Sequence, residues 1–147
     1  MPQGQCKWIS YNVDGLSREK FEELFNKVLF DYDIIILLET FANSHSQYVR
    51  NDFISYSKIR KRSPFAKRNS GGILILIRKN IATHFKMLKS TSDDILWVRS
   101  SGLFSGGDII IGGIYCSPIN SSATDGNFYN CLERDIYHYT NRYPNDK

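Results

Sequence analysis

"KWISYNVDGLSREKFEELFNKVLFDYDIIILLE", residues 7–39, places a helical pattern between two apolar runs of different kinds. The first run, residues 7–13, is rich in β-branched and aromatic residues and predicts a strand, which Gly15 ends. The second run, Ile34–Leu38, is continuously apolar and predicts a strand buried on both faces. Between them, with Ser17 as the predicted N-cap, the apolar residues recur at helical spacing: Phe21, Leu24, Phe25, Val28 and Leu29. This order predicts a βαβ unit, whose strand ends and loops gather at one rim.

The next sixty residues show a different pattern. Four apolar stretches follow one another with short polar connections and predict an antiparallel meander: residues 53–59, 73–79, 95–98 and 108–115. Helical spacing returns over residues 128–143. The helical faces imply an α/β fold in which helices cover a sheet. The meander is apolar on both faces, so we expect it to form one half of a two-layered core.

Length and composition bound the class of protein. With 147 residues and 41% hydrophobic content, the chain is the size of one domain, 1–147. No apolar run reaches the length of a membrane helix, and the N-terminus lacks a secretory signal, so no membrane partner is expected. The three cysteines are widely separated and predict an intracellular location, in the nucleus or the cytoplasm.

The net charge of +4 is unevenly distributed along the chain. Residues 53–92 contain ten Lys and Arg and no acid, so the rest of the sequence is acidic. A positive stripe beside an acidic region suits a polyanion held over a metal site. The alternative is a solvated loop and strand edge.

Polar side chains follow three of the predicted strands. Asn12 and Asp14 follow the first strand, and Glu39 follows the second. The carboxyl ends of adjacent parallel strands are where open α/β sheets bind ligands, and carboxylate and amide oxygens suit a hard cation such as Mg²⁺. Tyr115 ends a later strand and could donate to a phosphate oxygen. The structural alternatives are a turn at "NVDG", a solvated Glu39 and a half-buried tyrosine.

The three histidines carry a weaker signal. His45, His84 and His138 do not lie beside an acid or a cysteine in the sequence. We therefore predict that each is a surface or packing residue.

Five motifs occur in a recognisable order: "YNVDGL" (11–16), "ILLETF" (36–41), "SGGILILIRKNI" (70–81), "DILWVRSS" (94–101) and "IYCSP" (114–118). Together they resemble the endonuclease/exonuclease/phosphatase superfamily. The branch they resemble most is the apurinic/apyrimidinic-type endonuclease of non-LTR (LINE-like) retrotransposons. The resemblance implies the N-terminal half of a DNase I-like four-layered α/β/β/α sandwich. It also implies an endonuclease that uses Mg²⁺ (or Mn²⁺) to cleave DNA.

The resemblance also implies roles for individual residues. Glu39 would be the principal metal ligand, and Asp14 would approach the metal through water. Asn12 would orient the catalytic groups, and Tyr115 would contact the scissile phosphate. In the full-length family, a reverse transcriptase domain lies C-terminal to this region. The basic loop would lie on the DNA backbone through Arg60, Lys61, Arg62, Lys67 and Arg68.

The sequence departs from the family in its catalytic motifs. It contains neither the Gly-Asp-Phe-Asn motif nor the Ser-Asp-His motif that the family carries in its second half. We therefore expect a truncated, catalytically incomplete domain of retroelement origin, because hydrolysis needs an oriented, deprotonated water. We also expect an inner sheet face without its partner sheet, whose apolar surface would favour self-association.

Two other functions remain open from the sequence. One is a non-catalytic nucleic-acid-binding module built on the basic loop. The other is a metal-dependent phosphatase acting on a phosphorylated lipid or small molecule, since the same superfamily contains both activities.

Overall fold

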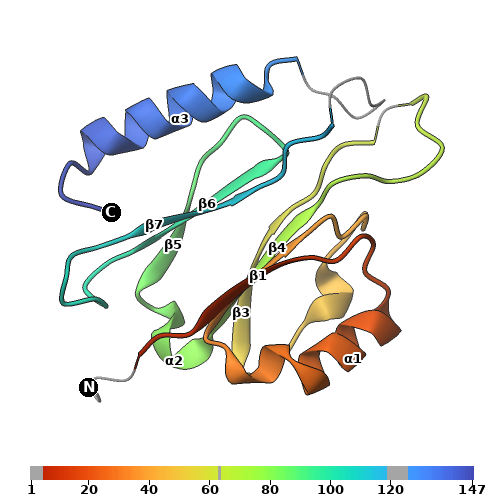
Figure 1. The fold of residues 1–147 in the computed structure, drawn as a ribbon, viewed down its shortest axis with the longest axis horizontal. Coiled ribbons are helices and arrows are strands. Elements are labelled where there is room, and N and C mark those ends of the chain that lie inside the picture. Colours follow the sequence, from red (N-terminus) through yellow and green to blue (C-terminus); the bar gives the residue numbers. More distant parts are fainter. Residues whose placement is uncertain (1–4, 63, 119–125) are drawn as a thin grey trace.

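The computed structural model describes residues 5–62, 64–118 and 126–147. Its strands form two sheets that lie face to face between two helices (Figure 1). The first sheet has the order β1-β2-β4-β3, with bounds Trp8–Asn12 (β1), Ile34–Leu38 (β2), Ile73–Arg78 (β4) and Phe53–Lys58 (β3). The second has the order β5-β6-β7, with bounds Phe85–Leu88 (β5), Ile95–Ser100 (β6) and Ile110–Ile114 (β7). The helices and 3₁₀ turns are Arg18–Lys27 (α1), Leu29–Asp31 (η1), Ser46–Tyr48 (η2), Lys79–Ala82 (α2) and Phe128–Arg142 (α3).

The predicted βαβ unit is confirmed. β1 and β2 are parallel neighbours, and α1 begins at the predicted N-cap, where the Ser17 hydroxyl accepts the Lys20 N–H at 3.1 Å. The apolar side of α1 packs against the outer face of the first sheet. Phe21 and Phe25 on this side are almost completely buried. The helix is therefore anchored by the residues whose spacing predicted it.

Two further cores complete the layers. Between the sheets, isoleucines of β2 and β4 pack against Leu96, Val98 and Ile111 of the second sheet. On the outer face of the second sheet, Trp97 packs against Tyr139 of α3 and donates its indole N–H to Asp135 at 3.0 Å. The order is therefore α1, first sheet, second sheet, α3. The predicted four-layered α/β/β/α class is confirmed.

The prediction of a single meander is wrong. β3 and β4 pair antiparallel with each other, and β4 also pairs with β2, so both belong to the first sheet. The remaining strands form the second sheet together with β5, which the pattern did not predict. The sequence period shows which residues alternate along a strand, but the choice of neighbouring strands depends on long-range packing.

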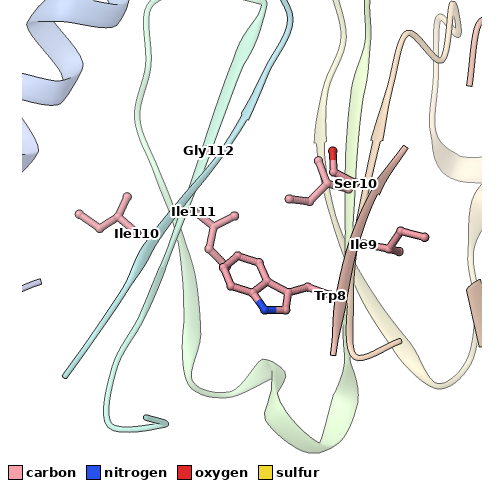
Figure 2. A pocket seen from close by; sticks show the side chains of 7 residues that line it. Trp8, Ile9, Ser10, Ile110, Ile111 and Gly112 are labelled. Carbon is pink, nitrogen blue, oxygen red and sulfur yellow. The ribbon is translucent and has the colours of Figure 1, made fainter. Parts of the chain in front are cut away.

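The expected bare inner face is also wrong, because the second sheet covers it. The opening lies instead at the edge strands β1 and β7, which flank a pocket of about 350 Å³. Figure 2 shows Trp8 and Ile111 pointing into this space, while Ile9 and Ile110 point away from it. Trp8 remains 56% exposed. The apolar surface expected on the inner sheet face is therefore buried between the sheets.

No helix in the part of the chain that the structure describes is long and apolar enough to cross a membrane.

We predict that Gly113→Ala lowers the free energy of unfolding by about 1–3 kcal/mol. A Cβ at this position would lie 2.8 Å from Ile73 Cγ2 and 3.4 Å from Ile36 Cγ2, and would therefore push the two sheets apart. Chemical denaturation of the two proteins measures the difference. Gly126→Ala is the control, because a Cβ there has no neighbour within 4 Å. Equal stability of both variants would contradict the claim of tight packing between the sheets.

Candidate active-site rim

The segments that directly follow β1, β2 and β7 lie at one end of the sandwich, together with the described residues of the basic segment between β3 and β4 (Figure 1). Beyond the regular strands, the backbones of the first two loops stay paired. Val13 N–H donates to the Leu38 carbonyl at 2.9 Å, and Gly15 N–H donates to the Glu39 carbonyl at 2.7 Å. This pairing places Asn12 and Asp14 beside Glu39, as the βαβ prediction required. The Asn12 side-chain oxygen accepts the Asp14 N–H at 3.0 Å and so fixes the turn.

The rim concentrates unusual backbone conformations. Asp14, Glu39 and Phe41 have φ angles of 44°, 57° and 54°, and they are the non-glycine residues with positive φ among those that the structure describes. Such residues persist only where their surroundings hold them, and they cluster at functional sites. Both predicted carboxylates therefore project from locally strained backbone.

The "SGG" motif supports the second of these loops. Phe41 N–H donates to the Gly71 carbonyl at 2.9 Å, and Thr40 N–H donates to the Gly72 carbonyl at 3.3 Å. A Cβ at Gly72 would overlap the Thr40 hydroxyl oxygen, and Gly72 itself has a φ of 93°. Only glycine lets the backbone just before β4 approach this closely to the residue that follows Glu39.

Tyr115 reaches the rim from the other sheet. Its N–H donates to the Asp94 carbonyl at 3.0 Å, directly after the end of β7. Burial raises the pKa of its hydroxyl, and the hydrogen bond to Glu39 and the negative charge of that carboxylate raise it further. The structure therefore brings Glu39 and Tyr115 together, although 76 positions of sequence separate them.

Arg60 lies at the base of the rim and not on the exposed loop. Its guanidinium forms an ion pair with Asp94, and their side chains are only 10% and 5% exposed. It also donates to the Ser117 hydroxyl at 2.8 Å, and its guanidinium carbon lies 5.6 Å from the centre of the Tyr115 ring. A Cβ at Gly71 would lie 3.1 Å from Arg60 Nε, so the same motif makes room for this pair. Arg60 therefore links the loop before β4 to the segment that carries Tyr115.

The other four predicted DNA-binding residues lie on the exposed part of the loop: Lys61, Arg62, Lys67 and Arg68. Arg62 donates to the Ala66 carbonyl at 2.8 Å, which closes the loop on itself. Arg68 lies over the Phe41 ring at 5.6 Å and so reaches the rim. Their contact with DNA stays a prediction.

The hydrogen bonds of His45 were not found from the sequence. His45 is 7% exposed, and it hydrogen-bonds Thr40 Oγ1 through Nε2 at 2.8 Å and Ser57 Oγ through Nδ1 at 2.5 Å. Burial lowers the pKa of its imidazole to about 4, so the ring is neutral near pH 7. The prediction that His45 is a packing residue agrees with its burial. Its partners could not be found in the sequence, because Ser57 lies on a different strand.

The rim offers few donors for a metal ion. Within the described ranges, no three His, Cys, Asp or Glu side chains gather into a metal-holding group. The available oxygens belong to Glu39, with Asp14 on the neighbouring loop. Mg²⁺ commonly takes one or two carboxylates and completes its shell with water and substrate phosphate. The donor set therefore fits a largely hydrated Mg²⁺, and not a closed structural metal site.

We predict that Asp94→Asn lowers the free energy of unfolding by about 3 kcal/mol, because it leaves the buried Arg60 charge without its counter-charge. Urea denaturation measures the change. The control is Glu23→Gln, which breaks the exposed Lys27–Glu23 pair and should leave stability nearly unchanged. Equal effects of the two substitutions would show that the Arg60–Asp94 pair is not structural.

Solved structures share the fold. They include the apurinic/apyrimidinic (AP) endonuclease from Leishmania major, with a TM-score of 0.58 and 17% identity, covering 95% of this chain and 46% of that one. A 3′ phosphatase from Neisseria bound to a product DNA hairpin has a TM-score of 0.56 and 12% identity, covering 94% and 54%. An AP endonuclease from Archaeoglobus fulgidus has a TM-score of 0.53 and 14% identity, covering 95% and 52%. The chain thus spans about half the length of these structures.

No curated protein matches the sequence significantly. The model of the Endonuclease/Exonuclease/phosphatase family matches residues 9–146, which is nearly the whole chain. The matched region contains the strands of both sheets except for Trp8 at the start of β1, both long helices and every rim residue described above. The protein therefore belongs to the Endonuclease/Exonuclease/phosphatase family.

Proposed function

We propose that this chain is the metal- and phosphate-binding part of a divalent-metal-dependent endonuclease domain that acts on DNA. The observation that carries the proposal is the meeting of Glu39 and Tyr115 at one rim, from two different sheets. A carboxylate beside a neutral phenol combines a metal ligand with a hydrogen-bond donor for a phosphate oxygen. Membership of the family supports this use of the rim.

Each rim residue has a role in the proposal. Glu39 is the principal ligand of Mg²⁺ or Mn²⁺, and Asp14 contacts the metal through water. Asn12 orients the catalytic groups, and Tyr115 donates to the scissile phosphate. When bound, a divalent cation supplies Lewis-acid charge stabilisation at the phosphate.

Arg60 has a different role from the one that the sequence resemblance implied. Its guanidinium is already paired with Asp94 and bonded to Ser117, so we propose that it positions Tyr115 and leaves DNA contact to its exposed neighbours. Those neighbours are Lys61, Arg62, Lys67 and Arg68. The DNA hairpin bound by the Neisseria structure supports DNA as the polyanion.

We further propose that the sequence is of retroelement origin, with a reverse transcriptase domain following this region in the full-length protein. The chain carries no Gly-Asp-Phe-Asn and no Ser-Asp-His motif, so the groups that orient and deprotonate the attacking water are not in this sequence. Because catalytic groups that act as a unit lose most of their rate when one is removed, the chain by itself is catalytically incomplete.

We predict that the purified chain leaves supercoiled plasmid intact in the presence of Mg²⁺, as measured by gel electrophoresis, yet binds Mn²⁺ in a titration. Glu39→Gln should weaken that binding by roughly tenfold or more, while Glu23→Gln on the exposed face of α1 should not change it. Robust nicking that Glu39→Ala abolishes would overturn the proposed inactivity. A wild-type chain that binds no Mn²⁺ would overturn the metal role.

The second candidate is a non-catalytic nucleic-acid-binding module. It is favoured by the four exposed cations of the basic loop, since the loop itself contains no carboxylate. A phosphatase of the same superfamily remains the third candidate, and the Neisseria 3′ phosphatase shows that the fold carries this activity.

We predict that duplex DNA binding weakens steeply with salt, with a slope of about −0.9 for each phosphate neutralised in a plot of log affinity against log salt concentration. Fluorescence anisotropy measures this slope. Replacing Lys61, Arg62, Lys67 and Arg68 by Gln should flatten it, whereas Lys27→Gln on α1 should not. Binding that persists in Glu39→Gln without metal favours the binding module. Binding that needs both Glu39 and the metal favours the endonuclease.

A further inference from the structure

The segment Glu39–Phe41 is held in a conformation that its residues do not favour. Glu39 and Phe41 both have positive φ, which costs on the order of 1–3 kcal/mol for each non-glycine residue. The backbone must therefore be fixed by contacts outside the segment. Those contacts decide where the Glu39 carboxylate points.

Thr40 is the residue through which the segment is held. It is 1% exposed, its carbonyl accepts the Leu16 N–H at 2.9 Å, and its N–H donates to the Gly72 carbonyl at 3.3 Å. Its hydroxyl makes the shorter bond, at 2.8 Å to His45 Nε2. Thr40 is therefore held by its side chain as well as by its backbone.

The imidazole of His45 carries this bond across to another strand. Its second nitrogen bonds Ser57 Oγ on β3, which is an edge strand of the first sheet. Because the ring is buried and neutral, one nitrogen donates and the other accepts, and both partners are hydroxyls that can do either. The chain Thr40–His45–Ser57 thus ties the end of β2 to β3.

A neighbouring side chain holds the first loop in the same way. Tyr48, at the end of η2, packs against the His45 ring with centroids 5.8 Å apart, and its hydroxyl donates to the Leu16 carbonyl. The short segment from His45 to Tyr48 therefore supports both loops of the rim. One side chain supports the Asp14 loop, and the other supports the Glu39 loop.

We propose that His45 is a positioning residue, whose buried imidazole links Thr40 to Ser57 and fixes the turn that presents Glu39 at the rim. The proposal rests on the proposed function only for the consequence in metal binding. If His45 only filled space, its hydrogen bonds to Thr40 and Ser57 would not matter. An apolar side chain of similar size could then replace it without changing the two loops.

The test uses three single variants of the full chain and measures amide hydrogen exchange by NMR. His45→Leu removes both bonds and keeps an apolar filling, whereas Ser57→Ala removes only the distant bond on the surface. The control is His138→Gln, at an exposed position of α3. The reporters are the N–H groups of Gly15, Leu16 and Phe41. All three lie in the supported loops, and their hydrogen bonds hold these loops in place.

The expected result is local. His45→Leu should speed exchange at the three reporters by about tenfold or more, and Ser57→Ala by less. Exchange of the Ile36 and Ile75 amides in the central strands should change by less than exchange at the reporters. His138→Gln should change none of them. His45→Leu should also weaken Mn²⁺ binding by about tenfold, as loss of a supporting hydrogen bond does at other metal sites.

Each alternative outcome decides the proposal. Unchanged reporters in His45→Leu would overturn it, and so would an equal increase at all amides, which indicates a loss of global stability alone. Local loosening in His45→Leu combined with no Mn²⁺ binding by the wild-type chain would support the positioning role and overturn the proposed metal function. The two claims can therefore fail separately.

Discussion

The packing of the two sheets against each other is the constraint on which the rim depends. Glu39 follows a strand of the first sheet and Tyr115 follows a strand of the second, so their meeting requires both sheets to be in place. The two sheets pack closely because Gly113 of β7 adds no side chain between them. The site therefore arises from tertiary packing, and no single loop contains it.

Two polar links with buried members hold the loops at this end of the molecule, one between the sheets and one within the first sheet. Arg60 and Asp94 connect the loop before β4 to the turn before β6, and His45 connects the end of β2 to β3. The Arg60–Asp94 pair, His45 and Thr40 are almost fully buried, whereas Ser57 at the far end of the second link is exposed. Buried polar groups are costly unless their partners are in place, so these links specify the arrangement of the loops as well as stabilising it.

The sequence predicted those parts of the fold that depend on local spacing. The βαβ unit, the Ser17 cap and the last helix could be read from periodicity and turn residues. The assignment of β3 and β4 to the first sheet could not, because strand order depends on which apolar faces meet in three dimensions. For the same reason, Arg60 could not be distinguished from its exposed neighbours. All five are cations in one loop, and only the position of Asp94 separates them.

The contact between Gly72 and Thr40 has a consequence for evolution. Any side chain at position 72 would overlap the Thr40 hydroxyl, while that hydroxyl is needed by His45. Substitutions at the two motifs "SGG" and "ETF" are therefore not independent. A lineage that loses the glycine must also give up the hydroxyl and the imidazole that binds it. Substitutions at Thr40, His45 and Gly72 should thus be coupled.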